Sequence, residues 1–385
     1  MSSSPLNGWL PGVLSDTQVA TLRDSGWIEG LAANSEIGAS AVDLTLSDEC
    51  YKMINGSIKP FGESYAHFVL NNQRLAQRLK PDSGDTFTLQ KQHTFVFRLK
   101  EELGTALRNE RKLYGQATAK SSVGRVDVLA RLIVDGMDSY EFFNPCGAHN
   151  GSGKMFLEIT PITFNVRVKP GCSLTQLRLF YGDPHDCEIR GKELYGSVLI
   201  GGLQDGCLSV DLTNTKIHGK SGCAFRAKPN DTPVALWEDK SALQDLPDPK
   251  QYWDLLESTD LESKGCFSIE KEHFYILRSK EEISLPPGVA VYCRAIDETI
   301  GEMRIHYAGF VHPRFGYQRD DGAQGTPLIF EVRGHDVSVT LTDGEKMARL
   351  TFYRLSADST PKKSPYDKQV LQLSKFFGEW KWNCE

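Results

Sequence analysis

The stretch Phe87-Thr-Leu-Gln-Lys-Gln-His93 recurs as Phe267-Ser-Ile-Glu-Lys-Glu-His273, and this repetition decides the fold. Both stretches run on to an arginine, Arg98 or Arg278, and then to a Lys-Glu-Glu triplet. The two occurrences are 180 residues apart (267 − 87). A repeat of this length indicates that the chain contains one structural unit twice.

Two further matches support a duplication. Val42-Asp-Leu44 matches Val210-Asp-Leu212 at an offset of 168 residues (210 − 42), and Lys169-Pro-Gly171 matches Thr342-Asp-Gly344 at 173 (342 − 169). The changing offset indicates insertions and deletions in surface loops, where they are tolerated. We therefore predict two tandem domains, copy one over residues 1–200 and copy two over residues 201–385.

The pattern within each copy is that of β-strands. Apolar residues alternate with polar ones over residues 87–89, 95–97 and 174–179, as in half-buried strands. Pro170-Gly171 is a turn signal between two such strands. Many short strands with Gly and Pro turns predict a mainly β protein, with a barrel or sandwich in each copy and few helices.

Two segments carry helix signals. Ser15-Asp-Thr-Gln18 has the pattern of a capping box and predicts a short helix that ends at Gly26. Asp248-Pro249 predicts a second helix start, with Tyr252, Leu255 and Leu256 on one face.

The composition narrows the classes of function. The 385 residues carry a net charge of −6, with 40% hydrophobic and 24% charged residues, as in ordinary globular proteins. This charge gives no support to binding of nucleic acid or of an anionic membrane, and no apolar run approaches the ~20 residues of a membrane span. Nine scattered cysteines without Cys-x-x-Cys spacing favour reduced thiols and a cytoplasmic location.

A polar turn at Ala119-Lys-Ser-Ser-Val-Gly-Arg125 carries the functional signal. Hydroxyl and guanidinium groups close together suit phosphate recognition, and Gly124 permits close approach of the backbone. In this interpretation Lys120 and Ser122 bind phosphate oxygens. The alternative is a simple polar turn whose hydroxyls satisfy nearby backbone groups.

Glu158 is the candidate carboxylate. It lies within Met155-Phe-Leu-Glu-Ile159, and if it points inward it needs a partner, for which Arg125 is the candidate. A strand-edge glutamate facing water remains the alternative. Zinc deamination is not indicated, because Pro145-Cys146 is not followed by a second cysteine at the required spacing.

Together these segments resemble the dCTP deaminase branch of the dUTPase-like superfamily. The resemblance rests on Ala119–Arg131, Phe156–Ile159 and Lys169–Leu179, with Ala39–Leu44 as an early strand and Tyr366–Phe377 as a C-terminal tail. It extends through both copies and is greatest for the long, duplicated bacterial form. It implies two tandem dUTPase-like (β-clip) barrel domains.

The resemblance also implies a mechanism: metal-free hydrolytic deamination of dCTP to dUTP and ammonia. Glu158 would be the general base, Ser121 would hold the attacking water, and Arg125 would orient both. The implied substrate-binding residues are Lys120, Ser122, Phe156 through its backbone, Gln176, Tyr366 and Gln369. Mg²⁺ would arrive on the triphosphate, and neither zinc nor any dedicated metal site is expected.

Copy two departs from the turn pattern. Aligning Gly301 with Gly124 places Glu298, Thr299 and Glu302 opposite Ser121, Ser122 and Arg125. The acids would repel a triphosphate. We therefore expect copy two to be a scaffold that lends its tail to copy one, although Glu331 stands in register with Glu158 (331 − 158 = 173).

Three functions remain open at this point. dCTP deaminase leads, followed by a dUTP pyrophosphatase or a bifunctional enzyme that converts dCTP to dUMP. The third is a nucleotide-binding regulator without catalysis. The superfamily also suggests a homo-oligomer, with a trimer expected.

Overall fold

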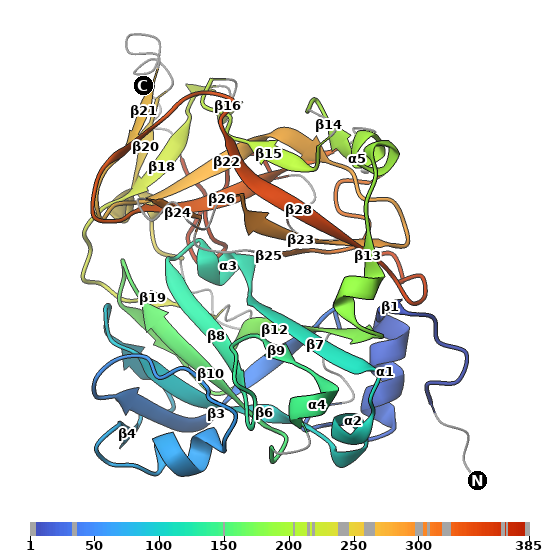
Figure 1. The fold of residues 1–385 in the computed structure, drawn as a ribbon. Coiled ribbons are helices and arrows are strands. Elements are labelled where there is room, and N and C mark those ends of the chain that lie inside the picture. Colours follow the sequence, from blue (N-terminus) through green and yellow to red (C-terminus); the bar gives the residue numbers. More distant parts are fainter. Residues whose placement is uncertain are drawn as a thin grey trace.

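The protein is described by a computed structural model. It covers residues 5–32, 37–148, 151–202, 205–213, 216–217, 220–237, 246–257, 266–296, 303–305, 309–317, 325–362, 366 and 369–381. The two copies stack on each other, with copy one below and copy two above in Figure 1. The mainly β architecture, with a few short helices, confirms the predicted fold class. No helix in these ranges has the length and apolar character needed to cross a membrane.

Copy one is built on a ten-stranded sheet with the path β8-β10-β6-β3-β12-β7-β9. Three short strands extend it: β1 beside β12, β2 beside β6 and β4 beside β3. The bounds are β1 Gly12–Val13, β2 Ile28–Glu29, β3 Val42–Met53, β4 Ala76–Leu79, β6 Phe95–Leu103, β7 Leu113–Ala119, β8 Val128–Val134, β9 Phe142–Phe143, β10 Lys154–Pro161 and β12 Ser173–Tyr181.

The strands of copy two, joined by β13 and β14 from the end of the range predicted for copy one, form two main sheets. One has the path β13-β28-β23-β25 with β15 beside β28, and the other the path β20-β18-β22-β26-β24 with β14 beside β22. Their bounds are β13 Glu188–Ile189, β14 Leu199–Ile200, β15 Cys207–Ser209, β18 Ala224–Ala227, β20 Trp253–Leu256, β22 Phe274–Ile283, β23 Val289–Ala295, β24 Met303–Ile305, β25 Gly309–Val311, β26 Thr326–Gly334 and β28 Lys346–Arg354.

Smaller elements complete the fold. β19 joins β11 and β5 of copy one in a sheet, while β16 pairs with β17 and β21 with β27. The remaining bounds are β5 Phe87–Leu89, β11 Val166–Val168, β16 Lys216–Ile217, β17 Lys220–Ser221, β19 Val234–Ala235, β21 Phe267–Ile269, β27 Val339–Leu341, α1 Asp16–Asp24, η1 Ala66–Leu70, α2 Thr105–Asn109, α3 Ser121–Gly124, α4 Pro145–Ala148, η2 Pro184–Cys187, α5 Lys192–Val198 and η3 Pro249–Gln251.

A buried hydrogen-bond motif occurs in both copies and supports the duplication. The carboxylate of Glu101 accepts bonds of 2.7 Å from the backbone N–H and the hydroxyl of Thr45. Glu281 accepts the same two bonds, also 2.7 Å long, from Ser209. Glu101 and Glu281 differ by 180 residues (281 − 101), so the first sequence match is in the correct register.

The match of Val42–Leu44 to Val210–Leu212 is wrong by four residues. Gly171 N–H donates to Leu46 O at 2.8 Å, and Gly344 N–H donates to Val210 O at 3.0 Å. Leu46 therefore corresponds to Val210, an offset of 164 (210 − 46). Three identical letters were too short a match to fix the register of a strand.

The predicted helix starts have different outcomes. α1 begins after Ser15 with both bonds of a capping box, as predicted. After Asp248 the chain forms only the single turn η3, and β20 follows. The helix predicted there is wrong, because Leu255 and Leu256 pair with β18 instead of covering a helix face. The domain boundary near residue 200 stays a prediction.

Candidate active site

The polar turn of copy one lies where the two copies meet (Figure 1). β7 ends at Ala119, and α3 is a single helical turn in which Gly124 N–H donates to Lys120 O and Arg125 N–H to Ser121 O. This tight turn directs Arg125 away from its own sheet and into the junction. Its side chain is only 2% exposed.

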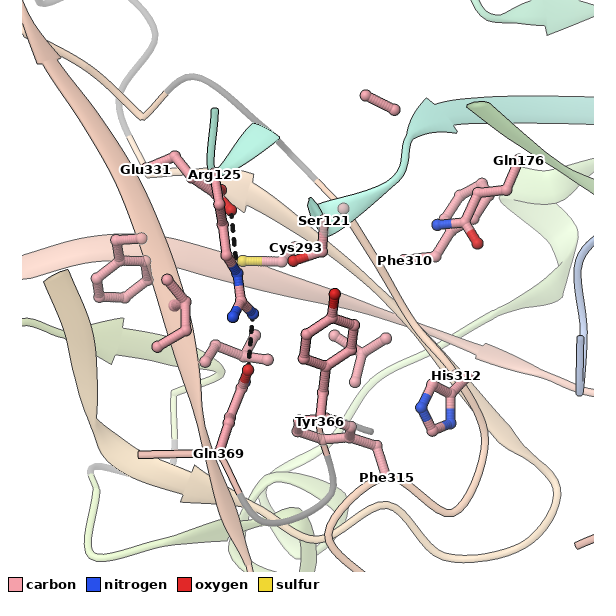
Figure 2. Close-up of a pocket in the computed structure, with 16 residues that line it drawn as sticks. Ser121, Arg125, Gln176, Cys293, Phe310, His312, Phe315, Glu331, Tyr366 and Gln369 are labelled. Atoms are coloured by element: carbon pink, nitrogen blue, oxygen red, sulfur yellow. Dashed lines mark hydrogen bonds and ion pairs between the residues drawn. The ribbon is translucent and has the colours of Figure 1, made fainter. Parts of the chain in front are cut away.

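A cavity of about 100 Å³ opens beside this turn, with walls from both copies. Figure 2 shows Ser121 and Arg125 of copy one near Cys293 and Glu331 of copy two, with Gln176 of copy one next to Phe310 of copy two. The aromatic and C-terminal part of the lining comprises Phe310, His312, Phe315, Tyr366 and Gln369. The pocket therefore exists only where the copies adjoin.

Arg125 is the centre of the polar contacts. Its Nε lies 3.9 Å from Oε1 of Glu331, and both side chains are almost fully buried. Its Nη2 donates to Oε1 of Gln369 at 2.6 Å, and its guanidinium lies 4.7 Å from the ring centre of Tyr366. The guanidinium is thus fixed between the carboxylate of copy two and the C-terminal segment.

Burial dominates the acid–base properties of Glu331. Loss of solvent raises its pKa to about 8, and the positive charge of Arg125 acts in the opposite direction. A carboxyl group with such a pKa can both take up and release a proton near neutral pH. Cys293 is next to it, and burial, followed by the charge of Glu331, raises the pKa of this thiol to about 12.

The expected pairing of Glu158 with Arg125 is wrong. Glu158 lies directly opposite Arg131 in the β10–β8 pair, and Arg131 Nη2 donates to its Oε1 at 2.5 Å. The hydroxyl of Tyr140 donates to its Oε2 at 3.0 Å. The physical reason is that β10 turns this face toward copy one's own chain, away from α3.

Phe156 shares the environment of Glu158. Its side chain is 1% exposed and packs with Tyr65 in a cluster that includes residues of η1. The residues between β3 and β4 thus cover this side of β10. The structure does not bring Phe156 to the pocket.

Lys120 and Ser122 flank the pocket instead of lining it. Lys120 forms an ion pair with Asp43 of β3, and its side chain is 26% exposed. The backbone O of Ser122 accepts a 2.6 Å bond from the hydroxyl of Ser374, which ties α3 to the C-terminal segment. Their expected phosphate contacts stay predictions.

The structure does gather the other predicted residues. Ser121, Arg125, Gln176, Tyr366 and Gln369 all line the one cavity. The copy-two turn, with Glu298, Thr299, Gly301 and Glu302, lies outside the described residues.

Glu331 was expected to belong to a scaffold without a phosphate-binding turn around it, but the structure places it next to the turn of copy one for which phosphate binding was predicted. It stands beside Ser121 and Arg125 of copy one. Its register with Glu158 was visible in the sequence, but the sequence did not show which carboxylate faces the turn. Cys293, Phe310, His312 and Phe315 carried no motif by which sequence reasoning could have found them.

The mainly β fold of two stacked copies agrees with the class of protein that the sequence resemblance implied. A family model for the N-terminal domain of 2′-deoxycytidine 5′-triphosphate deaminase matches residues 10–183, and the model for its C-terminal domain matches residues 191–377. The chain belongs to the 2′-deoxycytidine 5′-triphosphate deaminase family. Its reaction is the deamination of dCTP.

Solved structures agree in fold. The crystal structure of 2′-deoxycytidine 5′-triphosphate deaminase from Agrobacterium tumefaciens is similar with a TM-score of 0.76 and 24% sequence identity. The similarity covers 91% of this chain and 97% of the Agrobacterium chain. The comparison with curated proteins found no match.

Proposed function

We propose that dCTP is deaminated in the junction pocket, with Glu331 of copy two as general base and with Ser121 and Arg125 of copy one beside it. The observation that carries this proposal is the 3.9 Å approach of Arg125 Nε to the buried carboxylate of Glu331 in a pocket also lined by Ser121. Arg125 Nε has no hydrogen-bond partner among the described residues.

The reaction proceeds in two proton-transfer stages. In the first, a water held by Ser121 and Arg125 attacks C4 of the cytosine, while Glu331 takes a proton from the water and passes it to N3. In the second, Glu331 moves the hydroxyl proton to the amino group, the C4–N4 bond breaks, and ammonia leaves as the C4 carbonyl forms. Water and dCTP are consumed, and dUTP and ammonia are produced.

The aromatic residues of the pocket suit a pyrimidine ring. Phe310 and Phe315 come from copy two, and Gln176 of copy one supplies an amide to the same lining. Lys120 and Ser122, next to the pocket, are proposed to bind the triphosphate. Mg²⁺ is proposed to travel with the triphosphate, since it prefers phosphate oxygens and retained waters to a dedicated protein cage.

The cellular context is also a proposal. Six of the cysteines that the structure describes are free thiols, namely Cys50, Cys172, Cys187, Cys207, Cys266 and Cys293. Free thiols support a reducing compartment such as the cytoplasm. A trimer is proposed from the superfamily resemblance, and light scattering during size-exclusion chromatography would measure it.

Two matched substitutions test the general base. We expect Glu331→Gln to abolish conversion of dCTP to dUTP and ammonia, because Gln cannot accept the proton. Glu158→Gln removes the corresponding carboxylate of copy one and is expected to leave the products unchanged. Ion-exchange chromatography of the nucleotides, with an ammonia assay, measures both outcomes.

The same experiment separates the competing functions. Intact dUTP from the wild type identifies a deaminase, whereas dUMP with pyrophosphate identifies a bifunctional enzyme or a dUTP pyrophosphatase. Tight dCTP binding without turnover would favour a regulator. A fully active Glu331→Gln protein together with an inactive Glu158→Gln protein would return the base to copy one.

A further inference from the structure

A second ion pair crosses the junction beside the first. Arg333 Nη1 of β26 donates to Oδ2 of Asp127 at 2.7 Å, and the Asp127 side chain is fully buried. Asp127 follows Arg125 by two residues, and Arg333 follows Glu331 by two residues. Because side chains alternate along a strand, Glu331 and Arg333 point to the same face of β26.

The two pairs have opposite polarity. Copy one presents Arg125 and then Asp127, while copy two presents Glu331 and then Arg333. If the turn slid by two residues along β26, a distance of about 7 Å, Arg125 would meet Arg333. Only the observed register gives attraction at both positions.

Thr163 completes the second pair. Its hydroxyl donates to Asp127 Oδ2 at 2.5 Å and accepts from Arg333 Nη1 at 3.0 Å. The backbone of Asp127 is also held, since its N–H donates to Gly124 O at 2.8 Å and its O accepts from Ile162 at 2.9 Å. The position of Asp127 is therefore coupled to the end of α3, from which Arg125 extends.

Stability alone does not account for this network. Oδ1 of Asp127 is buried without a hydrogen-bond partner in the described structure, and Asp127 adopts a left-handed backbone with φ 58°. A buried ion pair is in general weak support for stability, because desolvation offsets the attraction. Its better-attested use is to fix one arrangement over others.

The positive charge of Arg333 has no counterpart at the equivalent strand position of copy one. The copy-one residue in register with Arg333 is Thr160 (333 − 173), and its hydroxyl hydrogen-bonds to Thr94 at 3.0 Å. Thus the strand position carries a cation only where it meets the catalytic turn.

We propose that Asp127, Arg333 and Thr163 form a positioning network that sets the placement of Arg125 relative to Glu331. The proposal rests on the role given above to Glu331. None of the three residues lines the cavity, so the network acts through Arg125. Substitution is therefore expected to lower kcat and to leave the KM for dCTP within about twofold, since Lys120 and Ser122, proposed to bind the triphosphate, precede the end of α3 that Asp127 holds.

The most conservative test is Thr163→Val, which removes the hydroxyl group and keeps the shape of the side chain. We expect kcat to fall by roughly tenfold, equivalent to about 1.4 kcal/mol in the barrier. The acid limb of the kcat profile is expected to move to higher pH, because a displaced Arg125 lowers the pKa of Glu331 less. Thr160→Val, its matched control in copy one, should retain the wild-type kcat and profile.

The double variant Asp127→Asn/Arg333→Gln is the stronger test. It removes both charges together, so neither charge is left buried alone, and Asn tolerates the left-handed backbone. We expect kcat to fall by about ten- to a hundredfold, with the same direction of shift in the pH profile. Should this variant fail to fold, Thr163→Val decides the question.

The outcomes separate this proposal from the previous one. The positioning network alone would be overturned if Glu331→Gln is inactive while Thr163→Val and the folded double variant keep the wild-type kcat and pH profile. An equal loss in Thr160→Val and Thr163→Val would also overturn it, by showing a general packing effect. An active Glu331→Gln would overturn both proposals.

Discussion

At the scale of single residues, Glu158 and Glu331 show how position in the fold decides the chemistry of a side chain. Both lie at the same place in their strands, and both are buried. Glu158 is neutralised by Arg131 and hydrogen-bonded by Tyr140. Glu331 has only the more distant Arg125 as a cation among its described contacts, and burial raises its pKa to about 8.

The raised pKa of Glu331 predicts that the free energy of unfolding falls as the pH rises. The folded protein holds this proton up to about pH 8, while the unfolded chain releases it near the ordinary value of 4.5. The contribution to stability is thus complete below the unfolded pKa and is lost as the pH rises to the folded pKa. Glu331→Gln should therefore be more stable than the wild type above about pH 6, by on the order of 4 kcal/mol at pH 8.

Thermal unfolding of both proteins between pH 5 and 9 measures this difference. The gap in Tm should widen with pH and level off above the folded pKa. Glu158→Gln is the control, and it should show no such gain, since removing its carboxylate leaves Arg131 without its partner. Equal Tm values for Glu331→Gln and the wild type at pH 8 would contradict the prediction.

At the scale of elements, the C-terminal segment completes the active-site turn. Arg125 donates to the side chain of Gln369 at 2.6 Å and to the backbone O of Gln372 at 3.1 Å. Gln369 in turn donates to Pro327 O at 2.8 Å, next to the start of β26. The segment therefore connects the guanidinium to the strand that carries Glu331.

This arrangement predicts different effects for the two glutamines. Gln369→Ala removes a hydrogen bond to a charged group, worth about 1.5–3 kcal/mol, so kcat/KM should fall at least tenfold. Gln372→Ala keeps the backbone oxygen that accepts from Arg125 and should have near wild-type activity. Steady-state kinetics of the two variants would make the comparison, and equal losses would show that the side chain of Gln369 has no special role.

Local elements were predictable where the signal was local. The capping box at Ser15 and the alternation over β5, β6 and β12 are local signals, and the predicted helix start and strands are present. The half-buried character expected of β12 is wrong, since its polar residues Thr175 and Arg178 are also buried. The helix after Asp248 failed because Leu255 pairs with Phe225, a contact that no local pattern reveals. Tertiary pairing overrode the helical spacing there.

The candidate site was likewise predictable only where its residues are neighbours in the sequence. Ser121 and Arg125 lie in one turn, so the sequence placed them together. The partner carboxylate depends on which copy faces the turn, and two equivalent glutamates satisfied the same sequence pattern. The sequence could not tell that Glu331, and not Glu158, lies beside the turn, because strand register does not report how two domains stack.

At the scale of the whole molecule, each copy provides a different part of one pocket. Copy one supplies the turn and copy two supplies the carboxylate. The other glutamate in register, Glu158, is covered by Tyr65, Phe156 and the η1 segment. The duplicated chain is therefore expected to hold one substrate molecule per chain.

Calorimetric titration of dCTP into Glu331→Gln measures this number without turnover. We expect a stoichiometry of one nucleotide per chain, and Arg125→Ala in the same background should weaken that single binding event. Two equivalent binding events per chain would show that the covered face of β10 opens to substrate.

The junction has a consequence for how the enzyme responds to dilution. A pocket shared between separate polypeptides comes apart as their concentration falls, whereas here one backbone connects the turn of β7 to the carboxylate on β26. A covalent link replaces bulk concentration with a fixed effective concentration, typically millimolar for short flexible connections. We therefore expect activity per chain to stay constant as the enzyme is diluted.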